Sequence, residues 1–312
     1  MKKLILLVFI FCAMPVFAQD TAQQQKDAEL IEKLVVIQKS NKQTNPAKEI
    51  KKLFTQHERY INARDIDGMS KLYADKYMSF DGFNKEVYLK LADKTWKTYR
   101  RLHYSYDINT IRIVDDNQAS VSLTEYISGI SVVGNQYIKE GYGILQNVSE
   151  SVYMVEKVNN RWQIVSDNIY SEHTALRYGS ARKVCANLVS PLQVKAGTDY
   201  IIGLDITPPE NTMVIASLAK EDITYPQVSA QEIFRSIEGN NLLERVVKSN
   251  DKNLNEYAVT FYVILDEMEE NETMETLRMK VSGVGLGMNR VNVIPKNNFI
   301  TEEEKEKDEK DK

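Results

Sequence analysis

The sequence contains little cysteine, histidine, proline and tryptophan: 2, 3, 7 and 2 of them, respectively, among 312 residues. The histidines, His57, His103 and His173, are far apart and lack the His-x-His or His-Glu-x-x-His spacing of metal ligands. We therefore predict no metal site and no cofactor, and we expect His103 and His173 at the surface or at a pocket rim. The sequence also lacks a Gly-x-Ser-x-Gly segment, which argues against a serine nucleophile of the hydrolase type.

Of the two cysteines, Cys12 lies in an apolar N-terminal segment that we expect to be removed. Cys185 is then the single cysteine, so an intramolecular disulfide has no second partner. We expect Cys185 to be a small buried side chain rather than a reactive thiol.

Residues 1–18 have the pattern of a secretory signal peptide. Lys2 and Lys3 precede an apolar run, and small residues lead to a cleavage site after Ala18. The mature protein is thus expected in the periplasm or outside a bacterial cell. No later apolar run reaches the length of a bilayer span. The formal net charge is −4 and no basic patch stands out, which argues against nucleic acid and anionic membranes as partners.

A chain of this length has room for two domains. After the signal, we expect a polar spacer with a short helix at 19–45 and a first domain at 46–180. A second domain is expected at 181–298, followed by a charged, disordered tail at 299–312.

The clearest pattern in the first domain lies in residues 50–81. Apolar side chains recur there with the spacing of one helical face, and His57 shares that face with Ile50, Leu53, Phe54 and Ile61. His57 should therefore point inward. Asp65 is the expected N-cap of a second helix that ends near Asp75, because an acidic side chain there accepts the free N–H groups of the first turn.

The run YINARDIDGMSKLYADKYMSFDG within this stretch resembles the opening helices of the nuclear-transport-factor-2-like superfamily, which includes SnoaL-like polyketide cyclases and ketosteroid isomerases. The later run NNRWQIVSDNIYS is similar to the closing strand of that family. The resemblance covers about residues 46–178. It implies an α+β fold in which three helices form a cone against a curved antiparallel sheet, with a cavity inside, and related folds often dimerise through the sheet.

The remainder of the first domain has the order that this resemblance implies. A helical pattern spans 84–99, and the chain then alternates as strands do, with turns at 115–117 and 159–160. On the second strand, Glu125 shares a face with Val121, Leu123 and Ile127. It is therefore a candidate cavity carboxylate whose burial would raise its pKa, and the alternative is an exposed glutamate at a sheet edge.

In the ketosteroid-isomerase branch a carboxylate base removes a proton next to a carbonyl, while two hydrogen-bond donors hold the developing enolate. By the resemblance, Asp81 matches the base, the phenol position falls on His57, and the protonated-acid position falls near Ser151. Of these three positions, only Asp81 thus has the type of residue that the family uses there. A turn or cap role for Asp81 ahead of Gly82 is the alternative.

Aromatic residues with polar tips are concentrated in this domain, which holds 13 of the 17 tyrosines and both tryptophans. Such side chains can line a pocket for a small apolar or aromatic ligand, or they can simply fill the core. The candidate ligand-binding residues are Tyr60, Trp96, Glu125, Ser151 and Tyr153.

Several short strand patterns at hairpin-like intervals after residue 181 predict a β-sandwich of immunoglobulin-like type, without the cysteine pair and tryptophan of true immunoglobulin domains. Separate strands are expected at 276–281 and 291–294, and a short helix at 229–237. The glycines at 283, 285 and 287 lack a following helix, which favours a bulged or twisted hairpin over a phosphate loop.

Two functions remain open from the sequence. The favoured one is a non-enzymatic protein that binds a small ligand, or a protein partner of the cell envelope, through the pocket and the sandwich. The alternative is a SnoaL-like isomerase or lyase with Asp81 as general base and His57 as polariser.

Overall fold

The computed structural model describes residues 45–131, 142–224, 233–237, 241–267 and 279–295. The predicted signal peptide, the predicted spacer up to residue 44 and the predicted tail lie outside the described residues. Residues from Pro46 onward form one compact unit.

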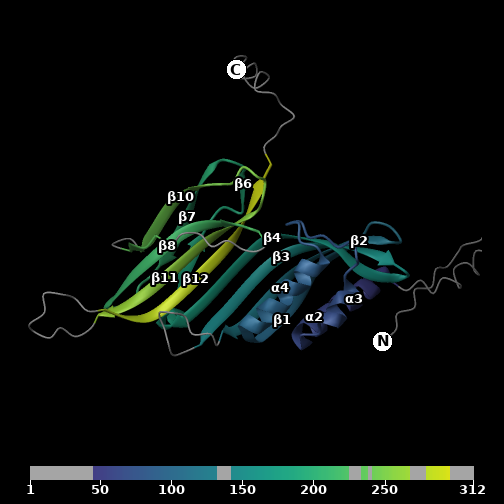
Figure 1. The fold of residues 1–312 in the computed structure, drawn as a ribbon, viewed down its shortest axis with the longest axis horizontal. Coiled ribbons are helices and arrows are strands. Elements are labelled where there is room, and N and C mark those ends of the chain that lie inside the picture. Colours follow the sequence, from purple (N-terminus) through teal and green to yellow (C-terminus); the bar gives the residue numbers. More distant parts are fainter. Residues whose placement is uncertain (1–44, 132–141, 225–232, 238–240, 268–278, 296–312) are drawn as a thin grey trace, which may run out of the picture. The chain divides into compact units, whose positions relative to one another are not determined.

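Three helices open this unit (Figure 1): α2 (Pro46–Ala63), α3 (Ile66–Leu72) and α4 (Lys85–Thr98). Pro46 opens α2, where proline's missing N–H costs nothing. Asp65 caps α3 by accepting from the Gly68 N–H at 2.8 Å, as predicted, and Asn84 caps α4 by accepting from the Val87 N–H at 3.0 Å. Helix α3 ends at Leu72, earlier than expected.

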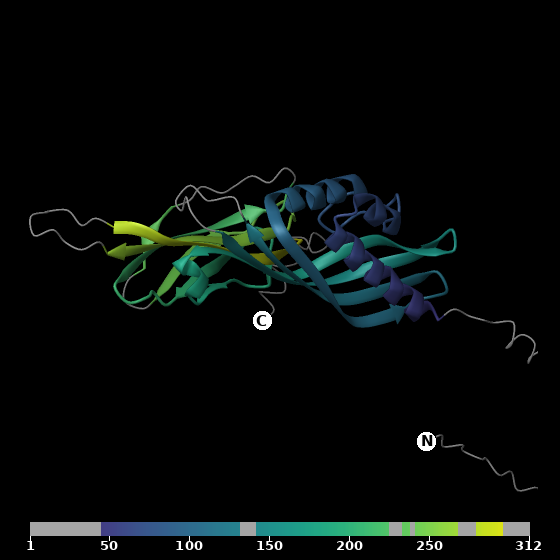
Figure 2. The same ribbon diagram turned by 90° about the horizontal axis from the view of Figure 1, so that it is seen from below.

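Four long strands follow in an antiparallel meander: β1 (Tyr99–Ile113), β2 (Gln118–Ser131), β3 (Gly143–Val158) and β4 (Arg161–Gly179). The β3–β4 turn consists of Asn159 and Asn160 with φ of 49° and 62°, a left-handed conformation that asparagine tolerates. The helices lie across this strongly curved part of the sheet (Figure 2). This order, in which the helices precede a meander of strands, is the one that the resemblance implies.

The remaining strands are β5 (Ala186–Val189), β6 (Gln193–Lys195), β7 (Asp199–Ile206), β8 (Thr212–Asp222), β9 (Arg235–Ser236), β10 (Leu242–Lys248), β11 (Glu256–Glu267) and β12 (Met279–Ile294). Strand β12 pairs with β4, so that a large sheet has the order β1-β2-β3-β4-β12-β11-β8-β9, and β6 also pairs with β12. A second sheet has the order β10-β7-β5. The two predicted domains therefore share a continuous sheet.

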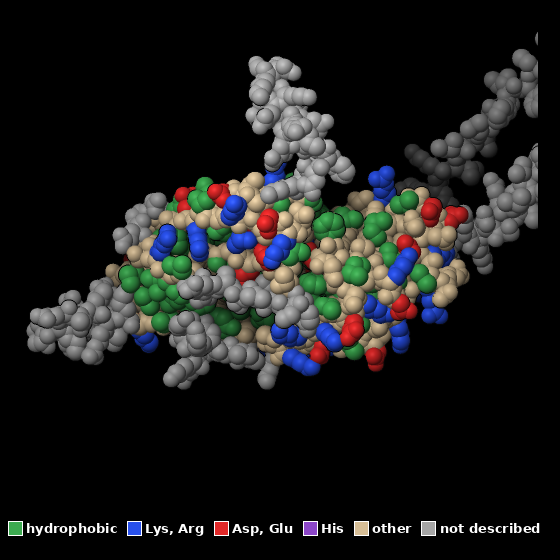
Figure 3. Space-filling model, turned by 45° about the horizontal axis from the view of Figure 1, so that its top comes forward, with side chains coloured by type: hydrophobic (Ala, Val, Ile, Leu, Met, Phe, Trp, Pro, Cys, Tyr) green, Lys and Arg blue, Asp and Glu red, His purple; other side chains and the backbone are tan. Residues whose placement is uncertain are grey.

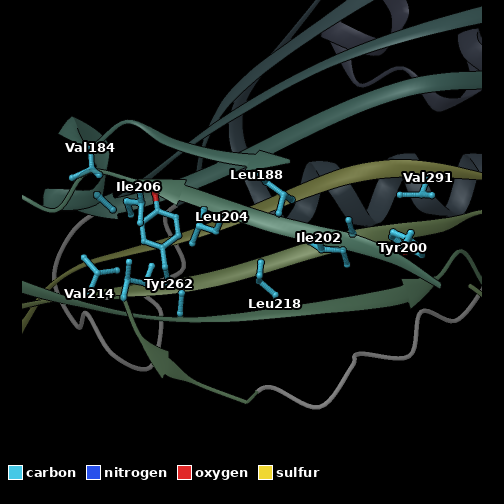
Figure 4. Packing of buried hydrophobic residues seen from close by; sticks show 14 of the residues in the cluster. Val184, Leu188, Tyr200, Ile202, Leu204, Ile206, Val214, Leu218, Tyr262 and Val291 are labelled. Carbon is cyan, nitrogen blue, oxygen red and sulfur yellow. The ribbon is translucent and has the colours of Figure 1, made fainter. Parts of the chain in front are cut away.

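The two halves have their cores on opposite faces of this sheet. Alternate residues of a strand point to opposite faces, so Asn289 and Arg290 on β12 point in opposite directions. The Arg290 side chain contacts the segment between α3 and α4, whereas the Asn289 amide donates to the Leu188 carbonyl of β5 at 2.7 Å. The second core lies between the two sheets, where β7 residues face residues of β8 and β11 (Figure 4).

The alternating glycines Gly283, Gly285 and Gly287 lie inside β12 and not at a turn. Gly285 is paired with Tyr262 of β11, and a Cβ on Gly285 would lie 2.0 Å from the Tyr262 ring. The glycines thus leave space for side chains of the neighbouring strand, which explains them without a phosphate loop.

Three details differ from the expectations for the second half. The predicted strands at 276–281 and 291–294 are parts of a single strand, β12. In the predicted helix 229–237, the described residues contain the short strand β9 instead. Cys185 is exposed and not buried, because it lies in the short link between the turn that follows β4 and strand β5.

In the described part of the chain, no helix combines the length and the apolarity that crossing a membrane requires. Figure 3 shows one face of the molecule, on which lysine and arginine side chains are interspersed with acidic ones.

Candidate functional site

The centre of the first core is His57, which points inward from α2 as predicted. Its Nδ1 atom lies 2.8 Å from the Tyr106 hydroxyl of β1, and its Nε2 atom lies 2.7 Å from the Tyr73 hydroxyl just after α3. The Tyr73 ring packs against Tyr77 and Tyr88, with ring centroids 4.8 Å away in each case. We call His57, Tyr73, Tyr77, Tyr88 and Tyr106 the tyrosine cluster.

The direction of the His57 hydrogen bonds follows from the charge of Glu125. The Tyr106 hydroxyl also bonds the Glu125 carboxyl group, and it donates to that group when Glu125 is ionised. In that state His57 Nδ1–H donates to Tyr106, and Nε2 accepts from Tyr73. Burial lowers the pKa of His57 to about 4, so the imidazole stays neutral in this position.

Glu125 lies on the inner face of β2 and is half-buried. The strand register places it opposite Tyr106 of β1 and opposite Ser149 of β3, which in turn lies opposite Glu172 of β4. Burial raises the pKa of Glu125 to about 7; the Tyr106 hydrogen bond opposes this, and the negative charges of Glu172 and Asp167 add to it. A row of polar side chains thus crosses the inner face of the sheet.

Asp167 on β4 is a second buried carboxylate of this face. It accepts a hydrogen bond of 2.7 Å from the Tyr77 hydroxyl. Burial raises the pKa of Asp167, and burial together with the adjacent Asp167 charge raises the pKa of Tyr77.

Asp81 is bound by residues of the second half. Its carboxylate accepts two bonds from the guanidinium of Arg290, at 2.7 and 3.0 Å, and a third from the Asn255 amide at 2.9 Å. The side chain of Arg290 is fully buried and that of Asp81 is 11% exposed. The arrangement is a buried ion pair that attaches the segment between α3 and α4 to strand β12.

The residues predicted for a site fall into different places. His57 and Glu125 are linked through Tyr106, whereas Asp81 is engaged by Arg290. Ser151 and Tyr153 are buried on the inner face of β3, where Tyr153 packs edge-on against Phe54 at 5.3 Å.

The two remaining predicted residues, Tyr60 and Trp96, pack near Ile61 and Met69 in a separate apolar cluster. Tyr60 also lines a surface groove of about 440 Å³ beside Trp162. His103 and His173 are exposed. Among the described residues, no group of three or more His, Cys, Asp or Glu side chains is arranged so that it could hold a metal ion.

Sequence reasoning did not single out Tyr73, Tyr106, Asp167, Glu172 or Arg290. Tyr106 could have been found, because strand alternation places it on the same face of β1 as Tyr104 and Ile108. Arg290 could not have been found, because it is 209 positions away from Asp81.

No protein-family model and no curated protein matches the chain. Similar solved structures include an NTF-2-like protein of unknown function from Shewanella oneidensis, with 18% identity over 40% of this chain and 98% of that chain and a TM-score of 0.31. A ketosteroid isomerase-like protein from Erwinia carotovora atroseptica has 13% identity over 40% and 94%, with a TM-score of 0.32. A hexachlorocyclohexane dehydrochlorinase (LinA) has 16% identity over 40% and 83%, with a TM-score of 0.33.

These likenesses carry no conclusion about activity. Within residues 46–179, three helices precede a four-stranded antiparallel meander, which is the α+β order that the resemblance implies.

Proposed function

We propose that this protein is a non-enzymatic binding protein, secreted or periplasmic, whose nuclear-transport-factor-2-like half takes a small apolar or aromatic ligand. The second half, for which we propose an immunoglobulin-like sandwich, would contact a protein partner in the cell envelope. The observation that carries the non-enzymatic part is the state of Asp81.

A general base needs a carboxylate oxygen that can reach a substrate proton. Both oxygens of Asp81 accept hydrogen bonds from Arg290, and one also accepts from Asn255. These hydrogen bonds pair the carboxylate with a buried guanidinium, and its separation from Arg290 would leave that group buried without a counter-charge. This supports a structural role for Asp81.

The second proposed catalytic residue is similarly engaged. Both ring nitrogens of His57 are hydrogen-bonded to tyrosine hydroxyls, so its single N–H is not directed at a ligand. The half-buried rings of Tyr88 on α4 and Tyr106 on β1 belong to the tyrosine cluster between the helices and the sheet. They support a surface for a flat or apolar ligand with hydroxyl groups at its edge.

The test combines binding with proton abstraction. Purified protein is screened by thermal shift against steroid-like, polyketide-like and neutral aromatic compounds, since a ligand of the folded state raises the melting temperature. Each ketone in the panel is also incubated with the protein in D₂O, and exchange of the protons next to the carbonyl is followed by NMR. We expect stabilisation without catalysed exchange.

Catalysed exchange that disappears in Asp81→Asn but persists in the exposed control Asp107→Asn would overturn the non-enzymatic proposal and favour the isomerase or lyase. Absence of any stabilising compound would overturn the ligand-binding part.

We also propose a homodimer through the outer face of the sheet. Tyr126 of β2 and Val148 of β3 are paired neighbours on that face and are 43% and 41% exposed. Sedimentation of the parent and of Val148→Lys tests this proposal: we expect a dimer that dissociates in the variant, and a monomeric parent would refute it.

A further inference from the structure

The inner face of the sheet holds more negative than positive charge. Asp81, Glu125, Asp167 and Glu172 lie on or against it, and Arg290 is engaged with Asp81. Asp167 accepts from Tyr77. Among the described residues, Glu125 and Glu172 have no ion pair within 4.0 Å, and their hydrogen-bond donors are neutral.

The donors to Glu172 come from two sides. The Tyr257 hydroxyl of β11 donates at 2.9 Å, and the Asn147 amide of β3 donates at 2.9 Å. Glu125 accepts from the hydroxyl of Tyr106. Both carboxylates are half-buried, so solvent reaches them although they lie on the helix-covered face.

Asn147 gives an independent indication of a missing partner. It is 7% exposed, and its NH₂ group donates to two residues of β4, Glu172 and Thr174. Its Oδ1 atom is buried and has no hydrogen-bond partner. Because the NH₂ group donates to β4, the planar amide directs Oδ1 to the side of β2, where Asn147 is paired with Ile127, two residues from Glu125 on the same face. A buried acceptor without a donor is destabilising, and a donor on a ligand would satisfy it.

The spacing favours an organic cation over a metal ion. Glu125 and Glu172 lie on strands that flank β3, so their backbones are about 10 Å apart at an interstrand spacing of about 4.8 Å. An ammonium group that donates at about 2.8 Å on each side fits between two such side chains more readily than a single ion does, because the ligands of an ion lie at about 2.0–2.6 Å.

We propose that the inner face between Glu125 and Glu172 binds an organic amine in its ammonium form, with Asn147 Oδ1 as a third acceptor. This rests on the proposed ligand-binding function of the first half and specifies the class of ligand. The ammonium neutralises two carboxylates that repel each other, and the hydroxyls of Tyr106 and Tyr257, which bond Glu125 and Glu172, flank the site.

Binding depends on pH through Glu125. The titratable groups that act on it are Tyr88 of α4, Tyr104 and Tyr106 of β1, Tyr153 of β3, and Asp167 and Glu172 of β4. The tyrosines stay neutral near pH 7, so the change comes from the carboxylates. An alkylammonium ion keeps its proton up to about pH 10, as lysine does. Affinity therefore rises as the pH increases from 6 to 8, because Glu125 loses its proton.

The experiment compares 2-phenylethylamine with its neutral analogue 2-phenylethanol, and cyclohexylamine with cyclohexanol, by calorimetric titration of the purified protein at pH 6 and pH 8. We expect the amines to bind at least tenfold more tightly than the alcohols at pH 8, with a smaller difference at pH 6. Glu125→Gln and Glu172→Gln should each weaken amine binding at least tenfold, and Glu125→Gln should also remove its pH dependence.

Asp107→Asn is the matched control, because Asp107 is next to Tyr106 on β1 but exposed on the opposite face. It should leave amine affinity unchanged. Equal binding of amines and alcohols would overturn the inference and leave the proposed function standing. Loss of affinity in all three variants alike would attribute the binding to net charge and also overturn it. Binding of neither class, and of no compound in the wider panel, would overturn both.

Discussion

Asp81 and Arg290 are 209 positions apart in the sequence, and their side chains form a two-pronged ion pair with nitrogen–oxygen distances of 2.7 and 3.0 Å. Arg290 belongs to β12, the strand that continues the sheet of the first half into the second. Asp81 precedes α4, so the pair fixes the helical layer to the sheet at the point where the two halves meet.

The ion pair leads to the first prediction. Asp81→Asn leaves a buried guanidinium without a counter-charge and should lower the free energy of unfolding by about 3–5 kcal/mol. Urea unfolding measures the loss. Asp75→Asn is the matched control, because Asp75 pairs with Lys85 but is fully exposed, and a loss of at most about 1 kcal/mol is expected. Equal losses in the two variants would contradict the structural role of Asp81.

The opposite pKa shifts of His57 and Glu125 lead to a prediction about pH. His57 titrates near 4 when folded and ordinarily near 6.5, so its contribution to stability is lost as the pH falls from 6.5 to 4. Glu125 titrates near 7 when folded and ordinarily near 4.5, so its contribution is lost as the pH rises from 4.5 to 7. Between pH 4.5 and 6.5 the two effects oppose each other.

Glu125→Gln removes one of these effects. Relative to the parent, the variant should lose up to about 1.4 kcal/mol of unfolding free energy for each pH unit as the pH falls from 6.5 to 4.5. Unfolding in urea at several pH values checks this slope. The exposed Asp107→Asn is the control and should follow the parent. If the difference between Glu125→Gln and the parent does not vary with pH, Glu125 is ionised normally.

Close packing at Gly285 gives a third prediction. Gly285→Ala places a methyl group 2.0 Å from the Tyr262 ring and should destabilise the protein by about 1–3 kcal/mol. Gly203→Ala in β7 is the control, because its Cβ would find its nearest neighbours at 3.8 Å. Thermal unfolding of both variants distinguishes a steric requirement from a general cost of alanine in a strand. If Gly285→Ala is as stable as Gly203→Ala, the steric account is wrong.

The hydrogen bond of the Tyr77 hydroxyl gives a fourth prediction. Tyr77→Phe leaves the buried Asp167 carboxylate without its 2.7 Å donor and should cost about 1–3 kcal/mol at pH 7, with a smaller cost at pH 4, where Asp167 can take up a proton. Tyr126→Phe, at an exposed tyrosine of β2, should change stability by less than about 0.5 kcal/mol. A cost of Tyr77→Phe that does not vary with pH would assign it to packing alone.

Much of the first half could be predicted from local patterns. The helical spacing around His57, the cap residue Asp65, and the turn at Asn159 and Asn160 are properties of short segments, and the structure has them where the sequence indicates. The inward direction of His57 followed from the same periodicity, since a helix places every third or fourth residue on one face.

The sequence by itself thus determined which segments form helices and strands in the first half, and which of their faces are apolar, because these depend on neighbours within a few residues. Only the tertiary structure decided what the polar residues contact. Asp81 was assigned a catalytic role by resemblance and is held by Arg290, while Glu125 and Glu172 meet on one face because β2, β3 and β4 align in register. Such partners are set by the pairing of strands far apart in the chain, and local sequence carries no record of that pairing.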